Sequence, residues 1–98
     1  MKLSRKSASA RVAKLGNWTL RGNVIARRFN FVDFAGAMRF VNKVAKLAEA
    51  ANHHPDIVIS YNKVRLVLTT HDEGGLTGKD FKLAGRINML MKRAGKPG

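Results

Sequence analysis

The chain has 98 residues, 45% of them hydrophobic, which suits one domain with a single core between two packed layers. It contains no cysteine, which excludes disulfides, thiolate nucleophiles and cysteine-based zinc sites. Nineteen Lys and Arg against six Asp and Glu give a net charge of +13, and no apolar stretch is long enough to predict a membrane span.

The positive charge is concentrated near the N-terminus, where eight basic residues precede the first acid, Asp33. Such a block is typical of a nucleic-acid surface, an organellar transit peptide or a solvated basic helix. No aromatics are interleaved with the early charges and no nucleic-acid-binding motif is found, which favours the solvated helix, with non-specific nucleic-acid contact as its consequence. With no signal peptide and no cysteine, we expect a cytoplasmic protein; organellar import is the alternative.

The first third of the chain predicts one helix and one hairpin. Apolar residues recur at helical spacing over residues 4–15, and residues 18–20 are typical of a short strand. After a turn at residues 21–23, residues 24–31 alternate with period two, which predicts a second strand. One face of this strand carries Ile25, Arg27, Phe29 and Phe31.

A long central helix is predicted over residues 34–51. Asp33 is a suitable N-cap, because its carboxylate accepts from unpaired first-turn N–H groups. The residue before Pro55 is pushed away from helical angles, so the helix ends before it. The expected buried stripe consists of Phe34, Met38, Val41, Val44, Ala45, Ala48 and Ala51.

The last part of the chain predicts a second hairpin and a third helix. Residues 57–61 and 64–70 alternate or are rich in β-branched side chains, with a tight turn at Asn62-Lys63 between them. A loop follows over residues 71–75. Thr77 and Asp80 then form an acidic version of a capping box that begins a helix extending to Arg93. The inner face of this helix is expected to carry Phe81, Ala84, Ile87, Leu90 and Met91.

The resulting order, α-β-β-α-β-β-α, predicts an α+β fold, with a four-stranded antiparallel sheet and helices packed on one face. We expect one domain over residues 1–98, with a basic N-terminal helix over residues 1–15 and a frayed tail over residues 94–98. Four short strands leave two sheet edges, which predicts a homodimer or homotetramer.

The three histidines all lie at element ends. A turn at Asn62-Lys63 pairs residues whose numbers sum to about 125, which places His54 opposite His71. Glu49 lies four residues before His53, at the same end of the central helix. Imidazole gains and loses a proton near neutral pH, so these side chains suit acid–base catalysis. Ordinary loop histidines and a tri-histidine metal site are the alternatives.

Four segments then carry a family resemblance: Glu-Ala-Ala-Asn-His-His-Pro at 49–55, Tyr-Asn-Lys-Val at 61–64, Thr-Thr-His-Asp at 69–72 and Gly-Gly-Leu-Thr-x-x-Asp at 74–80. Together they resemble the pterin-4a-carbinolamine dehydratase family, over roughly residues 18–91. The order of elements agrees with the fold of that family.

The resemblance implies a substrate and a reaction. The substrate is the 4a-hydroxytetrahydropterin left by an aromatic amino acid hydroxylase, and loss of water gives the quinonoid dihydropterin, as in tetrahydrobiopterin recycling. No metal or organic cofactor is implied. By position, the catalytic residues are His53, His54 and His71. The substrate-binding positions are Glu49, Asn52, Pro55, Thr70, Asp72 and Asp80.

Two features depart from the family pattern. Ile57 stands where many members carry an aromatic ring, and the N-terminal helix is unusually basic. Some relatives of the family act as a transcription-factor dimerisation cofactor or in Rubisco assembly, and the latter branch has lost catalytic residues. A non-catalytic module that contacts protein or nucleic acid through its basic surface is therefore the alternative. The three histidines favour the enzyme.

Overall fold

The structure is a computed structural model that describes residues 1–93. Its elements in chain order are α1 (Arg5–Leu15), β1 (Thr19–Arg21), β2 (Val24–Asn30), α2 (Phe34–Ala51), β3 (Asp56–Ser60), β4 (Lys63–Leu68), the 3-10 turn η1 (His71–Glu73) and α3 (Gly78–Arg93). The predicted order and the α+β class are confirmed. The predicted loop after β4 contains η1, and the predicted frayed tail, residues 94–98, lies outside the described residues.

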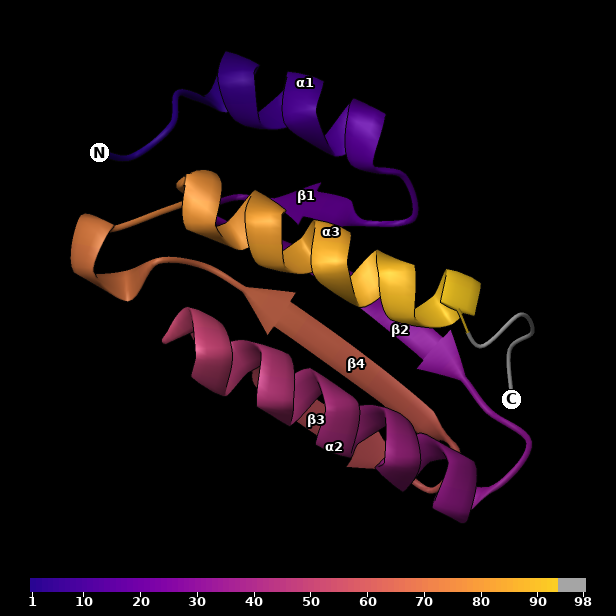
Figure 1. Cartoon of the computed structure of the whole chain (residues 1–98). Helices are drawn as coiled ribbons and strands as arrows, with labels where there is room; N and C mark the ends of the chain where they lie inside the picture. The colour runs from indigo at the N-terminus through magenta and orange to yellow at the C-terminus, as the bar shows by residue number, and fades with distance from the viewer. Residues whose placement is uncertain (94–98) are drawn as a thin grey trace.

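The four strands form one antiparallel sheet in the order β1-β2-β4-β3. All three helices lie on the same face of this sheet, as predicted (Figure 1). Side chains alternate accordingly: Phe29, Val64 and Leu66 are buried under the helices, whereas Arg28 and Arg65 on the other face are exposed. Among the described residues no helix is both long and apolar enough to cross a membrane.

Two-residue turns close both hairpins, and the second lies one residue earlier than predicted. Ser60 pairs with Lys63, so the turn is Tyr61-Asn62, with Tyr61 in the left-handed region at φ 54°. The predicted turn at Asn62-Lys63 and the pairing of His54 with His71 are therefore wrong. Asp56 pairs with Val67, a register that brings His54 level with Thr69 instead. Left-handed geometry at a tyrosine is uncommon, so the sequence signal at this turn was weak.

The buried stripe of α2 is rotated relative to the prediction. Val41, Val44 and Ala48 are buried as expected, but Phe34 is half exposed, and Ala45 and Ala51 are exposed. The stripe instead includes three residues that were not predicted: Gly36, Ala37 and Phe40. The Phe40 ring centroid lies 4.6 Å from that of Phe29 and 5.1 Å from that of Phe31. Contact with these two aromatic rings, one in β2 and one directly after it, sets the rotation of the helix, because a large ring buries more apolar area than alanine.

Asn88, a half-buried residue in the middle of α3, forms hydrogen bonds to three other parts of the chain. Its Oδ1 accepts hydrogen bonds from Trp18 Nε1 at 2.8 Å and from Arg27 at 2.5 Å, and its Nδ2 donates to the Leu15 carbonyl at 3.2 Å. The Arg27 guanidinium also lies 4.4 Å from the Phe29 ring centroid, and burial lowers its pKa. One amide therefore joins α3 to the end of α1, to the segment before β1 and to β2.

Candidate active site

The end of α2 fixes the position of His53. Asn52 adopts the left-handed conformation at φ 50°, ψ 42°, and its N–H donates to the Glu49 carbonyl. The N–H of His53 donates to the Ala48 carbonyl at 3.1 Å. These two bonds form a Schellman motif, in which asparagine is the usual substitute for glycine. His53 is therefore held by helix-terminal hydrogen bonds, and its ring is directed toward the start of α3.

Asp80 is the carboxylate that receives this ring. Its Oδ1 lies 2.6 Å from His53 Nε2, and its Oδ2 accepts from Thr70 Oγ1 at 2.8 Å and from the Thr77 N–H at 3.0 Å. Thr77 Oγ1 in turn accepts from the Lys79 N–H, one residue earlier than in a standard capping box, so the predicted box is confirmed in its Asp80-to-Thr77 half. The Asp80 side chain is 0% exposed, and that of His53 is 11% exposed. The capping carboxylate thus does two things: it begins α3 and binds the histidine.

The buried hydrogen bonds extend to both threonines. Because the Thr70 hydroxyl donates to Asp80, the Thr77 hydroxyl donates to Thr70 across 2.8 Å. No buried side-chain nitrogen or oxygen in the described part of the chain lacks a partner. A carboxylate with this many donors is held in one orientation, and it fixes the orientation of the imidazole that it binds. With Nε2 directed at Asp80, Nδ1 is the His53 atom available to a substrate.

His54 has a different and more exposed environment. Its Nε2 lies 2.5 Å from Glu49 Oε2, and the two side chains are 55% and 77% exposed. Glu49 was expected at the same end of the central helix as His53, and the structure pairs it with His54. An exposed pair of this kind contributes little to stability. Both groups remain accessible to a molecule bound at the end of α2.

His71 and Asp72 lie on η1, directly after the Thr70 that binds Asp80. Both are exposed, and no side-chain hydrogen bond to either is found among the described residues. Pro55 is half-buried where the chain enters β3. The structure therefore joins His53, Thr70 and Asp80 directly, whereas no hydrogen bond joins His71 to them. In residues 1–93 no three His, Asp or Glu side chains converge closely enough to hold a metal ion.

A cavity of about 310 Å³ lies beside His53, between the end of α2 and the first half of α3. Ala50, Ala51 and His53 line it from α2 and the chain after it, and Lys79, Lys82, Leu83 and Arg86 line it from α3. The three basic residues of this lining were not among the predicted site residues. Their spacing at i, i+3 and i+7 was the available signal, because such residues lie on one helix face. The fold and the carboxylate-held histidine define a small α+β protein with a candidate acid–base site where α2 and α3 meet.

Comparison with known proteins identifies the family. The sequence profile of pterin 4 alpha carbinolamine dehydratase matches residues 1–90. A relative from Chloroflexus aurantiacus, provisionally named pterin-4-alpha-carbinolamine dehydratase, is 52% identical over 90 residues, which is 92% of this chain and 97% of the relative. A Sulfurisphaera tokodaii relative with the same provisional name is 48% identical over the same shares. The chain belongs to the pterin 4 alpha carbinolamine dehydratase family, whose named activity is that of a hydro-lyase.

Solved structures with this fold carry two kinds of name. A transcriptional coactivator/pterin dehydratase from Brucella melitensis superposes with a TM-score of 0.87, at 34% identity, over 92% of this chain and 98% of that one. A pterin dehydratase-like RuBisCO assembly factor of the alpha-carboxysome superposes with a TM-score of 0.65, at 25% identity, over 76% of this chain and 88% of that one. Enzymatic and assembly roles are therefore both named on this scaffold.

Proposed function

We propose that this protein dehydrates a 4a-hydroxytetrahydropterin to the quinonoid dihydropterin, as in tetrahydrobiopterin recycling. The bond from C4a to the hydroxyl oxygen breaks, and that oxygen takes up a proton and leaves as water. The N5–H proton is lost, and a C4a=N5 double bond forms. The reaction therefore needs one proton donor and one proton acceptor near the same ring.

The His53–Asp80 pair is the observation that carries this proposal. A buried carboxylate on one ring nitrogen orients the imidazole and compensates the positive charge that forms when the other nitrogen takes a proton. His53 Nδ1 is thus suited to accept the N5–H proton. His54 and His71 are the proposed groups for protonating the departing hydroxyl. Both are exposed, and they directly follow His53 and Thr70, two residues that bind Asp80.

The remaining proposed site residues separate by burial. Glu49 and Asp72 are exposed, so they are the carboxylates that can contact the pterin ring, and Pro55 is half-buried. Thr70 is buried and bonded to Asp80, so it acts by positioning that carboxylate. Asn52 is required by the left-handed end of α2, whatever its contact with substrate. Position 57 is an isoleucine, which packs against the core cluster, so the aromatic ring that many family members carry at this position is missing.

The direct test is the initial rate of carbinolamine dehydration with and without the protein, because the substrate also loses water unaided. We expect the protein to accelerate the reaction well above the buffer rate, and a chelator to leave the acceleration unchanged. Acceleration that disappears on chelation contradicts a histidine-only mechanism. A rate equal to that in buffer contradicts the proposed activity.

The open face of the sheet favours a second function, the binding of a polyanion such as nucleic acid. Arg28 lies directly opposite Arg65 on neighbouring strands, an arrangement in which like charges repel. Two hollows of about 440 and 630 Å³ lie on this face, and both are lined by Arg28 and Arg65. Lys63 adds a positive charge to the first hollow, and Arg21 adds one to the second. In residues 1–92 no Lys or Arg side chain lies within 4.0 Å of a carboxylate. A bound polyanion would offset this repulsion.

This second function predicts binding without sequence preference and with a steep dependence on salt. Four phosphate contacts give a slope of about −3.6, so affinity should fall on the order of 10²-fold between 50 and 200 mM salt. Fluorescence anisotropy with a labelled duplex measures the change. Arg28→Glu/Arg65→Glu should abolish binding, whereas Lys6→Glu/Lys14→Glu on α1 should only weaken it. Equal losses in the two variants would show that total charge alone is responsible.

A further inference from the structure

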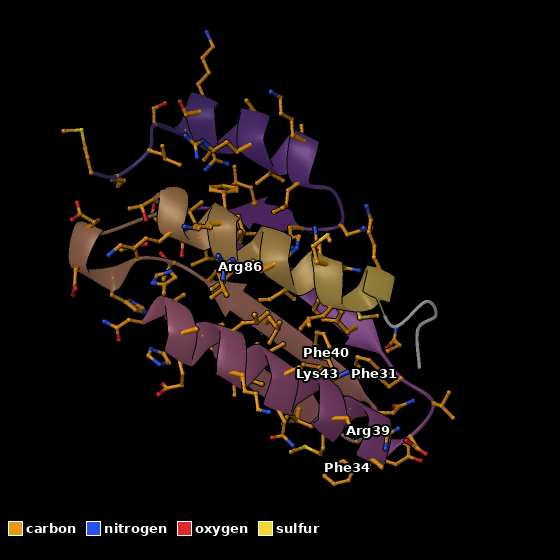
Figure 2. All side chains as sticks on the ribbon, in the orientation of Figure 1. Phe31, Phe34, Arg39, Phe40, Lys43 and Arg86 are labelled. Atoms are coloured by element: carbon orange, nitrogen blue, oxygen red, sulfur yellow. The ribbon has the colours of Figure 1, made fainter. Side chains whose placement is uncertain are left out.

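We infer that the cavity beside His53 receives an anionic group, a phosphate or carboxylate, carried on the side chain of the pterin substrate. The inference rests on the proposed function and specifies its substrate class. Three cations from α3 line the cavity on one side: Lys79, Lys82 and Arg86. Figure 2 shows Arg86 on the side of α3 that faces α2.

Within the described part of the chain these three cations have no carboxylate partner. Asp80, the acid in the first turn of α3, is directed inward and is occupied by His53, Thr70 and Thr77. In residues 1–92 every ion pair is formed by a histidine or by the N-terminal amine, and none by a Lys or Arg side chain. The charge lining the cavity is therefore available to an incoming anion.

Their arrangement is unfavourable for the isolated helix. Like charges three and four residues apart on one helix face repel one another. Lys79 also lies in the first turn of α3, where the helix dipole disfavours a positive charge. A bound anion would reverse both effects, because it meets the cations and the positive end of the dipole together.

The position of the cavity connects the anion to the reaction. His53 lines the cavity and also binds Asp80, so a group in the cavity lies beside the proposed base. The remaining lining from α2 consists of the small residues Ala50 and Ala51, which leave space for the ligand. A volume of about 310 Å³ is many times that of one water molecule, which occupies about 30 Å³ in the liquid. The space suits a side-chain anion, while the pterin ring lies toward the exposed His54 and His71.

The test compares three 4a-hydroxytetrahydropterins that differ in side chain: a neutral dihydroxypropyl group, its phosphate ester, and a benzoylglutamate with free carboxylates. At least one anionic substrate should have a KM about 10-fold or more below that of the neutral one, and this advantage should shrink as salt is raised. Comparison of the KM values for the phosphate ester and the benzoylglutamate shows which of the two anions the cavity prefers.

Lys82→Ala/Arg86→Ala should raise the KM for the preferred anionic substrate about 10- to 100-fold and leave its kcat within about twofold. The matched control is Lys43→Ala/Lys46→Ala, which removes two exposed cations of α2 that do not line the cavity. The control should retain the preference. Equal KM values for the neutral and anionic substrates in the unchanged protein would overturn the inference, as would equal effects of the two double variants.

Binding of the stable 7,8-dihydropterins with the same three side chains separates this inference from the proposed activity. Titration calorimetry measures the preference without turnover. If the protein binds the anionic ligand preferentially but does not catalyse dehydration, the proposed activity is contradicted and the anion site is not. Dehydration of all three substrates without any preference in binding counts against the anion site alone.

Discussion

The His53→Ala variant is expected to dehydrate the pterin carbinolamine about 10²- to 10⁴-fold more slowly than the unchanged protein, the usual contribution of a positioned acid–base group. The reason is structural: His53 is the histidine whose orientation a buried carboxylate fixes, through a 2.6 Å contact with Asp80. Removing the ring leaves the sheet and the helices intact, because the imidazole lies at the edge of the core. Stopped-flow absorbance gives the rate, and circular dichroism checks the fold.

Three further variants separate the contributions of the site. Asp80→Asn retains the size of the side chain and can still accept from Thr70, but it removes the charge that compensates a protonated His53. We expect a smaller loss of rate than for His53→Ala. His54→Ala, which removes an exposed ring paired with Glu49, serves as the comparison for a histidine without a buried partner. Unchanged activity in a folded His53→Ala/His71→Ala double variant would remove these histidines from the mechanism.

The Asn88→Leu variant is expected to lower the free energy of unfolding by about 3 kcal/mol, because the half-buried guanidinium of Arg27 and the indole N–H of the buried Trp18 lose their acceptor together. Asn88 Oδ1 accepts from both Trp18 and Arg27, and leucine provides no replacement. Urea unfolding followed by the fluorescence of Trp18, which is the only tryptophan, measures the loss.

Asn42→Leu is the matched control, because it makes the same chemical change at an exposed position of α2. It should alter the free energy of unfolding by no more than about 0.5 kcal/mol. Asn88→Asp should preserve much of the stability, since a carboxylate can accept from both Trp18 and Arg27. A loss below about 1 kcal/mol for Asn88→Leu would mean that other groups or water satisfy Arg27.

Local patterns were sufficient for the helices, the strands and one of the site contacts. The cap at Thr77 and Asp80 follows from a four-residue motif, and in the structure the side chains of both residues accept hydrogen bonds from N–H groups at the start of α3. The end of α2 before Pro55 was equally local. Local patterns failed where packing decides: the Phe40 ring rotated the buried stripe of α2, and a left-handed Tyr61 shifted the second hairpin.

The candidate site divides in the same way. The residue types and their motifs could be identified from the sequence, because His-His-Pro and Thr-His occur at short, fixed spacings. Their partners could not: the sequence placed Glu49 at the same end of the central helix as the histidines, and the structure shows that it binds His54. Helical periodicity predicts the face of the helix on which a side chain lies, but it does not predict the partner of that side chain. A hydrogen bond requires a specific atom at a specific distance.

The order of elements, the α+β class, the helix caps and the identity of the candidate acid–base residues could all be predicted from the sequence, since each depends on neighbours within a few positions. Three features required the folded structure: the contact of Asp80 with His53, the connection of α1, β2 and α3 by Asn88, and the three cations of α3 that line a cavity beside the histidine. Asp80 and His53 are 27 positions apart, and Asn88 and Arg27 are 61. Such contacts depend on how α2, α3 and the sheet pack together, and that packing is set by the shapes of buried side chains across the whole core.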